Sequence, residues 1–216
     1  MRVLVFDFGA GNLHSLEKAL RREGADVEVT ADPRSLLDGS PLVFPGVGAF
    51  DAAAERLAPA RDDIRRALLG GAPCLGICLG MQLLFERSEE GERPGLGVIP
   101  GRCVRIRARR VPHMGWNTLD VVAADPLFDG LAEPCMYFAN GYVAAPEDDA
   151  AVTATCSYER GNLVAAVRQG ALRGVQFHPE KSGEQGLRLL RNFLSLAARA
   201  APAGGPATAG AVGSGS

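Results

Sequence analysis

The sequence predicts an α/β fold with a mixed sheet, in which a parallel core carries helices on both faces and antiparallel strands are inserted beside it. Short apolar runs alternate with helical patterns over the first part of the chain, an order typical of parallel strands joined by helices. From about residue 98 to residue 176 the pattern changes to short strands divided by turns, which favours antiparallel pairing. A helical pattern then returns near the carboxyl end.

The first half supplies the predicted parallel strands. Four apolar runs indicate them, at residues 2–6, 27–30, 42–44 and 73–77. Helical patterns cover residues 12–23, 52–69 and 79–87. Gly24 is expected to end the first helix, and Pro59 to bend or split the second, because proline cannot donate the helical hydrogen bond. Leu79, Leu83 and Leu84 form one apolar stripe on the third.

The second half is expected to carry the inserted strands. They are predicted at residues 103–107, 119–122, 136–138, 152–157, 163–168 and 172–177. A helix follows from Gly183 to Arg199, with Leu187, Leu190 and Leu194 roughly in register. Residues 201–216 contain only Ala, Gly, Pro, Ser and Thr with one valine, and such a segment buries too little apolar surface to stay ordered. We therefore expect one domain over residues 1–200 and a disordered tail over 201–216.

Composition and charge exclude several classes of protein. The 216 residues are 47% hydrophobic and 22% charged with a formal net charge of −2, which is ordinary for one globular domain. The densest basic cluster is formed by Arg105, Arg107, Arg109 and Arg110, and its alternation indicates the solvent face of an edge strand rather than a nucleic-acid site. No eighteen apolar residues run together, and the first apolar run is too short for a signal peptide. We expect a soluble, cytoplasmic protein that binds neither membrane nor nucleic acid.

Cysteine usage agrees with that compartment. The chain has five cysteines, an odd number, and contains no C-x-x-C motif. This spacing indicates neither a disulfide framework nor a usual zinc site. We expect no metal and no cofactor.

Cys78 is the first candidate for chemistry. It lies between a short apolar strand and a helix, where helix amides and the macrodipole stabilise a thiolate. A lone cysteine is more often a small buried hydrophobe, but Gly76 and Gly80 flank Cys78 at i−2 and i+2 as in the G-x-S-x-G nucleophile elbow. Ligand sites of parallel sheets lie at the carboxyl ends of strands, where Cys78 is expected.

His178 and Glu180 are the candidate partners of this nucleophile. Pro179 is expected to keep their segment extended, so that the two side chains point the same way. His178 then takes the thiol proton while Glu180 orients the imidazole. A nucleophile, a base and an orienting carboxylate form the triad of covalent acyl transfer.

On these motifs the chain resembles the class I glutamine amidotransferases, whose elbow reads G-x-C-x-G and whose His and Glu lie in an F-H-P-E string. Within that family it is most similar to the glutaminase subunits of imidazole glycerol phosphate synthase. Further stretches carry the likeness: residues 7–13 (DFGAGNL), 45–50 (PGVGAF), 112–117 (PHMGWN) and 176–182 (QFHPEKS). The resemblance covers residues 1 to about 198 and implies a flavodoxin-like fold of the class I amidotransferase type.

The elbow and the resemblance together suggest roles for further residues. The elbow supplies the backbone amide of Leu79 to a tetrahedral oxyanion, and the resemblance implies a second donor in the 45–48 loop, at Val47. It also implies that glutamine is held by a set of residues along the chain: Gly48, Gln82, Glu90, Asn140, Gly141 and Tyr142. On sequence grounds alone Gln82 and Glu90 could equally be solvated surface residues. The chain departs from the family at Asn140-Gly141, where a histidine and a serine or threonine are usual.

The resemblance also implies a partner. A glutaminase domain leaves no room for a domain that uses ammonia, and the related subunits dock on a (β/α)₈ barrel cyclase as a heterodimer. Six residues match that interface: Pro112, His113, Met114, Trp116, Asn117 and Lys181. The same residues could instead be a packed turn and a surface lysine. Two other functions stay open, the subunit of another amidotransferase such as anthranilate synthase and a catalytically silent regulatory subunit.

Overall fold

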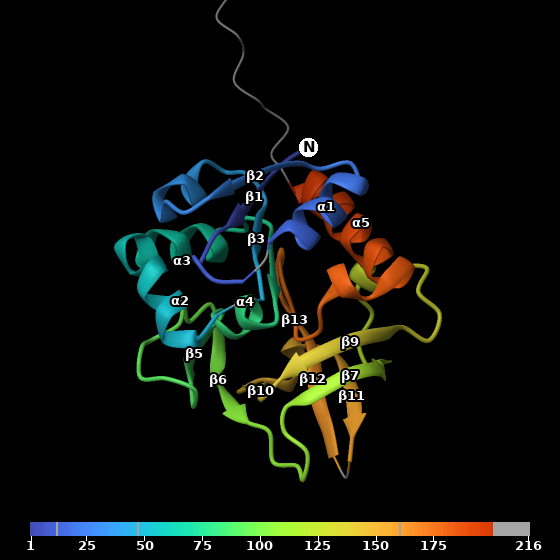
Figure 1. The fold of residues 1–216 in the computed structure, drawn as a ribbon. Helices are drawn as coiled ribbons and strands as arrows, with labels where there is room; N and C mark the ends of the chain where they lie inside the picture. Colours follow the sequence, from blue (N-terminus) through green and yellow to red (C-terminus); the bar gives the residue numbers. More distant parts are fainter. Residues whose placement is uncertain (12, 47, 160, 201–216) are drawn as a thin grey trace, which may run out of the picture.

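The computed structural model describes residues 1–11, 13–46, 48–159 and 161–200. The predicted tail, residues 201–216, lies outside the described residues. Figure 1 shows the helices gathered in the upper part of the molecule and most of the later strands in the lower part. Within the described residues no helix combines the length and apolar character needed to cross a membrane.

An eight-stranded mixed sheet forms the centre of the fold. Its order is β2 (Asp26–Thr30), β1 (Arg2–Phe6), β3 (Leu42–Phe44), β4 (Cys74–Ile77), β13 (Leu172–Val175), β12 (Gly161–Gln169), β11 (Val152–Tyr158) and β8 (Asp120–Val121). The first five strands pair in parallel, and the last three pair antiparallel. The predicted parallel core with antiparallel strands beside it is therefore confirmed.

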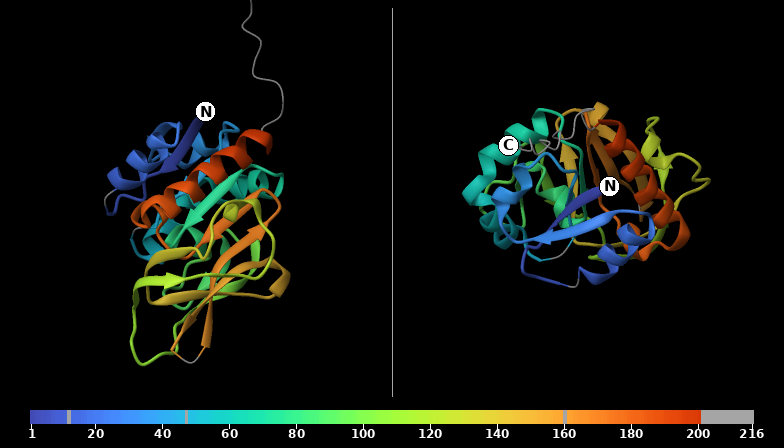
Figure 2. Two further views of the ribbon diagram at one scale, coloured as in Figure 1. Left: turned by 90° about the vertical axis from the view of Figure 1, so that its right-hand side faces the viewer. Right: turned by 90° about the horizontal axis from the view of Figure 1, so that it is seen from above.

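Helices cover both faces of the parallel part. α1 (His14–Arg22) and α5 (Gly183–Ala200) pack on one face, while α2 (Phe50–Leu57) and α3 (Arg61–Leu69) pack on the other. Successive residues of β1 point to opposite faces of the sheet. Val3 and Val5 pack in the core under α1 and α5, whereas Leu4 and Phe6 pack in the core under α2 and α3. The right-hand view of Figure 2 shows the sheet between these layers.

The predicted long helix over residues 52–69 is split, as Pro59 suggested. α2 ends at Leu57, the 3₁₀ turn η2 (Ala58–Ala60) follows, and α3 starts at Arg61. Further 3₁₀ turns are η1 (Pro33–Leu37), η3 (Pro126–Phe128), η4 (Asp149–Ala151) and η5 (Pro179–Lys181).

The predicted helix over residues 79–87 is wrong beyond its first turn. α4 covers only Leu79–Gln82, and β5 (Phe85–Ser88) follows. The carbonyl of Leu83 accepts from the N–H of Leu96 (2.7 Å), and that of Leu84 from Val98 (2.9 Å), so neither is free to continue a helix. Long-range backbone pairing has overridden the local leucine pattern.

Two small sheets complete the fold, and their strands were only partly predicted. One has the order β10 (Tyr142–Pro146), β6 (Ile99–Arg105), β5, and the other pairs β7 (His113–Thr118) with β9 (Cys135–Asn140). No strand was predicted at β5, β7 or β10. The edge-strand interpretation of the arginine cluster is also wrong, because β6 is the central strand of its sheet and Arg107, Arg109 and Arg110 follow it in a loop.

Candidate active site

The backbone at Cys78 forms a strained turn between β4 and α4. Its φ of 49° and ψ of −107° lie in a region that non-glycine residues rarely adopt. The N–H of Cys78 donates to the carbonyl of Val175 on the neighbouring strand β13 at 2.7 Å, which fixes the turn to the sheet. The side chain is 7% exposed. The sulfur is therefore presented at the carboxyl end of β4 in a nearly dry environment.

Three glycines leave the space that this turn needs. A Cβ atom on Gly80 would overlap the carbonyl oxygen of Phe44, and one on Gly76 would lie 2.6 Å from the carbonyl oxygen of Gly80. At Gly46, on the loop after β3, a Cβ would lie 2.6 Å from Cys78 Cβ and 3.0 Å from His178 Cε1. The predicted glycine elbow thus has a steric basis, and the loop after β3 packs directly against Cys78 and His178.

His178 and Glu180 lie next to Cys78, although not in the predicted geometry. His178 is extended, but Pro179, Glu180 and Lys181 form the 3₁₀ turn η5, so the expected extended segment is wrong. The turn still brings Glu180 Oε1 to 2.8 Å from His178 Nδ1. Two further bonds fix the base, since His178 N–H donates to the carbonyl of Tyr137 (2.8 Å) and Ser182 Oγ donates to the carbonyl of His178 (2.6 Å).

The charge on His178 is favoured by its surroundings. Burial alone would lower the pKa of this imidazole, but hydrogen bonds to Cys78 and Glu180 and the charges of both groups outweigh burial and raise it to about 9. Because Nδ1 is engaged by Glu180, Nε2 is the nitrogen left for Cys78. The structure therefore brings Cys78, His178 and Glu180 into one hydrogen-bonded line.

Gln176 contacts Cys78, which the sequence did not reveal. Its Nε2 lies 3.5 Å from Cys78 Sγ, and its side chain is 1% exposed. β13 pairs with β4 so that Val175 lies opposite Ile77, and the next residues of the two strands, Gln176 and Cys78, therefore meet. A polar residue between the apolar Val175 and Phe177 was the available signal, but its meaning depended on this long-range register.

Three of the predicted substrate residues form a network beside Gln176. Gln82 Nε2 donates to Gln176 Oε1 (3.3 Å) and to the carbonyl of Tyr142 (3.5 Å), and Asn140 Nδ2 donates to the same carbonyl (2.9 Å). Asn140 Oδ1 is buried and has no hydrogen-bond partner among the described residues. Within the described residues, the nearest neighbour of a Cβ on Gly141 would be Val111 Cγ1 at 3.8 Å, an ordinary van der Waals contact.

The other predicted substrate residues lie around the start of α2. The backbone N–H of Phe50 bonds to the carboxylate of Glu90. Partial burial raises the pKa of Glu90, the bond from Phe50 opposes the rise, and the charge of Asp51 adds to it. Asp51 in turn accepts from the N–H groups of Glu92 (3.1 Å) and Arg93 (2.9 Å). Glu90 is thus attached to the helix that follows Gly48, and Val47, the predicted oxyanion donor, lies outside the described residues.

The predicted interface residues divide between interior and surface. Met114 and Trp116 are 65% and 57% exposed on β7, and Pro112 and Lys181 are also exposed. His113 is instead buried, with its ring 4.5 Å from that of Phe138, which favours the alternative of a packed turn for this residue. Side chains alternate along a strand, which puts His113 inside and its neighbour outside.

Asn117 takes part in the support of this buried histidine. Its Nδ2 lies 3.3 Å from His113 Nε2 and donates to the carbonyl of Ser157 at 2.8 Å. Burial lowers the pKa of His113, which therefore favours the neutral imidazole.

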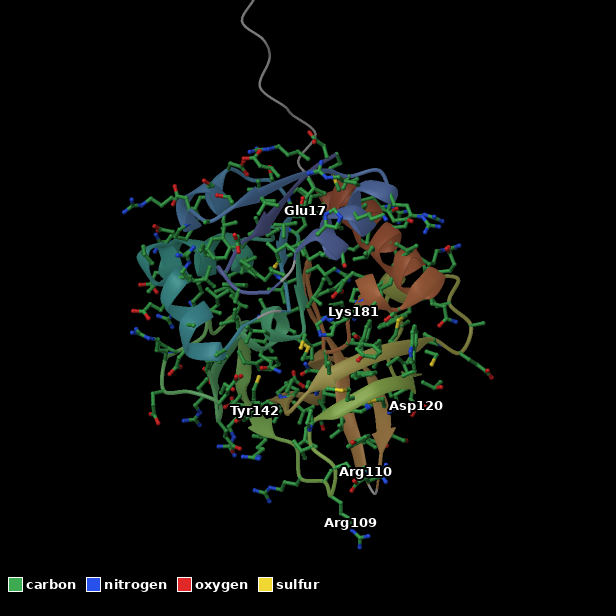
Figure 3. All side chains as sticks on the ribbon, in the orientation of Figure 1. Glu17, Arg109, Arg110, Asp120, Tyr142 and Lys181 are labelled. Carbon is green, nitrogen blue, oxygen red and sulfur yellow. The ribbon has the colours of Figure 1, made fainter. Side chains whose placement is uncertain are left out.

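The basic loop lies apart from this chemistry. Figure 3 shows Arg109 and Arg110 at the lower end of the molecule, and Tyr142 and Lys181 nearer its middle. The surface groove lined by Arg109, Arg110 and Tyr158 contains none of the triad residues. Across the described part of the chain no cluster of three or more His, Cys, Asp or Glu side chains could hold a metal ion.

Comparison with known proteins identifies the family. Residues 4–197 match the family described as Glutamine amidotransferase class-I. The chain belongs to the class I glutamine amidotransferases. The sheet and the elbow described above agree with this family, and the chain is an enzyme that hydrolyses an amide.

Individual members of this amidotransferase family match over most of their length. Imidazole glycerol phosphate synthase subunit HisH of Synechococcus sp. (strain JA-3-3Ab) is 46% identical over 212 residues, covering 95% of this chain and 98% of that protein. The HisH subunit of Natronomonas pharaonis is 44% identical, covering 89% and 93%. A crystal structure described as glutamine amidotransferase has 25% sequence identity and a TM-score of 0.72, covering 91% and 98%.

Proposed function

We propose that this chain is the glutaminase subunit of an imidazole glycerol phosphate synthase. It hydrolyses L-glutamine to glutamate and ammonia and supplies the ammonia to a cyclase subunit that makes imidazole glycerol phosphate and an aminoimidazole carboxamide ribotide (AICAR) in histidine synthesis. The observation that carries the proposal is the line Cys78, His178, Glu180, with 2.8 Å between the last two, in a chain 46% identical to a HisH subunit.

The first half of the reaction forms a thioester. Cys78 Sγ attacks the side-chain carbonyl carbon of glutamine while the thiol proton resides on His178. The amide oxygen becomes an oxyanion, for which the N–H of Leu79 and a second donor at Val47 are the proposed partners. His178 then gives its proton to the amide nitrogen, the carbon–nitrogen bond breaks, and ammonia leaves. The pKa of about 9 keeps His178 charged at neutral pH and ready to donate.

The second half returns the enzyme to its starting state. His178, now neutral, takes a proton from water, and the resulting hydroxide attacks the thioester carbon. The carbon–sulfur bond breaks, glutamate is released, and Cys78 and His178 again share one proton. Glu180 holds the imidazole by Nδ1 throughout, so that Nε2 faces the sulfur.

Glutamine is proposed to bind between the two halves of the domain. Gly48 and Gln82 are proposed to approach from the parallel half, Glu90 from the loop after β5, and Asn140, Gly141 and Tyr142 from the β9–β10 turn. Asn140 Nδ2 is occupied by the carbonyl of Tyr142. We therefore assign Asn140 to holding the turn. The carbonyls of Gly141 and Tyr142 already accept hydrogen bonds, so we assign their backbone N–H groups to contacting the substrate. On this basis the Asn-Gly substitution leaves glutamine binding intact.

The cyclase subunit is proposed to be a (β/α)₈ barrel that forms a heterodimer with this chain. Exposed apolar side chains on a short strand suit a protein interface, and Met114 and Trp116 provide them. Pro112 and Lys181, which are also exposed, are proposed to belong to the same interface. Ammonia released into neutral water would mostly protonate, so direct transfer favours a docked partner. We expect the reaction to occur in the cytoplasm, where reducing conditions keep a free thiol.

The test is a glutaminase and synthase assay of the chain with and without the cyclase. Glutamine-dependent formation of imidazole glycerol phosphate is expected only when both proteins are present. Activity with an anthranilate synthase partner instead would assign another amidotransferase. A complex that uses added ammonia but never glutamine would indicate a catalytically silent subunit.

A further inference from the structure

A continuous chain of amide hydrogen bonds ends on the nucleophilic sulfur. It begins at the carbonyl of Tyr142, which accepts from Gln82 Nε2 at 3.5 Å, and continues from Gln82 Nε2 to Gln176 Oε1 at 3.3 Å. Gln176 Nε2 then lies 3.5 Å from Cys78 Sγ, a distance suited to an N–H donor and a sulfur acceptor. None of the proposed chemical steps requires Gln176, so its buried amide is unexplained by the triad.

The direction of this chain is fixed by its first member. A backbone carbonyl only accepts hydrogen bonds, so the Gln82 group that faces Tyr142 must be the NH₂ group. The same NH₂ group faces Gln176, which must therefore present its oxygen there. The nitrogen of Gln176 then faces the sulfur. With the Gln176 amide turned the other way, its NH₂ group would face the NH₂ group of Gln82, and two donors would lie opposite each other.

Burial increases the importance of the hydrogen bond from Gln176 Nε2 to Cys78 Sγ. Gln176 is 1% exposed and Gln82 is 4% exposed, so solvent offers little replacement for either amide. A hydrogen bond to an ionised acceptor is roughly twice as strong as one to a neutral acceptor. An N–H aimed at the sulfur therefore favours the thiolate over the thiol, and it fixes where the sulfur lies.

We propose that Gln176 is a catalytic donor that stabilises the Cys78 thiolate, and that Gln82 is a positioning residue that holds the Gln176 amide in the donating orientation. This inference rests on the proposed glutaminase function, because it assigns Gln176 to the same nucleophile. The thiolate is both the attacking group and the group released in the second half-reaction, so the donor acts twice in each turnover.

The test measures the reactivity of Cys78 directly, without needing glutamine. The full-length chain is treated with iodoacetamide between pH 5 and pH 10, and alkylation of the Cys78 peptide is followed by mass spectrometry. The ionisable groups near this thiol are His178 and Glu180 after β13, Cys103 on β6, and Glu90, which interacts with Cys103. All of them are unchanged in the variants.

Two variants and one matched control separate chemistry from folding. Gln176→Leu removes the donor, and Gln176→Glu keeps the shape and the acceptor for Gln82 but replaces the donor with a carboxylate. Gln185→Leu is the control, because Gln185 also bonds two backbone groups, the N–H of Cys135 and the carbonyl of Ala132, away from the sulfur. Thermal melting of each protein reports its folding.

We expect the two Gln176 variants to alkylate Cys78 at least about tenfold more slowly at neutral pH, and the midpoint of the pH curve to rise, most in Gln176→Glu. In the cyclase complex kcat for glutamine should fall by a similar factor while KM changes little. If Gln176→Leu does not fold, the alkylation rate of Cys78 in Gln176→Glu alone tests the proposal. Wild-type alkylation rates in the folded variants, or an equal loss in Gln185→Leu, would overturn the inference. A wild-type complex that never hydrolyses glutamine would contradict the proposed function while leaving the alkylation result standing.

Discussion

Replacement of Gly46 by alanine tests how tightly the loop after β3 packs on the nucleophile. A new Cβ would lie 2.6 Å from Cys78 Cβ, 2.9 Å from the carbonyl of Ile77 and 3.0 Å from His178 Cε1. Carbon atoms in contact are normally about 3.5 to 4.0 Å apart. The methyl group must therefore push Cys78 away by about 0.9 Å, with no flexible side-chain end to absorb the shift.

The expected effect is mainly catalytic. A misplacement of about 1 Å can cost about a hundredfold in rate, whereas overpacking a core typically costs about 1–3 kcal/mol of stability. We expect Gly46→Ala to remain folded and to lower kcat for glutamine about a hundredfold in the cyclase complex. Synthesis from added ammonia should be unchanged, because it bypasses the triad.

Gly161→Ala is the matched control for that measurement. Its Cβ would meet no atom of the described part of the chain within 4 Å, and Gly161 lies at the start of β12, outside the proposed catalytic site. Both variants are assayed for glutamine-dependent and ammonia-dependent synthesis and melted in parallel. Glutamine turnover by Gly46→Ala within threefold of the wild-type rate would refute the steric argument.

Three other outcomes are expected from the same structure. Cys78→Ala should lower glutamine-dependent synthesis by about a thousandfold or more, as loss of a nucleophile does, while ammonia-dependent synthesis persists; glutamine turnover in that variant would remove Cys78 from the mechanism. Trp116, the only tryptophan, is 57% exposed, so its emission should shift when a tryptophan-free cyclase binds, and an unchanged spectrum at saturation would move the interface elsewhere. Burial lowers the pKa of His113, so as the pH falls the unfolded chain takes up a proton on this imidazole before the folded chain does. The stability of the fold therefore decreases as the pH drops below about 6.5. His113→Phe should weaken that decline in urea titrations, and equal slopes in both proteins would argue against it.

The sequence predicted the parallel half of the fold well because each of its strands and helices is indicated by residues within or next to that element. The apolar runs over 2–6 and 42–44 match β1 and β3 residue for residue, and Pro59 splits the helix between β3 and β4 as its chemistry requires. The pairing of glycines around Cys78 likewise indicated the elbow before any contact was known. These features depend on neighbours within a few residues.

The predictions that failed depend on distant segments. Leu83 and Leu84 have a helical pattern, but their carbonyls bond to residues 96 and 98. β7 contains Gly115 and only one deeply buried side chain, His113, so its sequence lacks an apolar alternation. Gln176 reaches Cys78 only through the register of β13 on β4. Each case required knowledge of which strands become neighbours.

The adjacency of β4 and β13 also bears on how such a protein can diversify. Cys78 and His178 follow two hydrogen-bonded strands, with Val175 opposite Ile77, so the backbone ladder sets much of their separation, and the long segment between them in the chain adds one bond, from the N–H of His178 to the carbonyl of Tyr137 on β9. That intervening segment builds β5 to β12, including both small sheets and the exposed face of β7. Insertions or replacements there that leave Tyr137 in place can reshape the proposed docking surface for a new synthase while the spacing of Cys78 and His178 is preserved. The surface proposed to bind the partner and the residues proposed to carry the chemistry can therefore change at different rates during evolution.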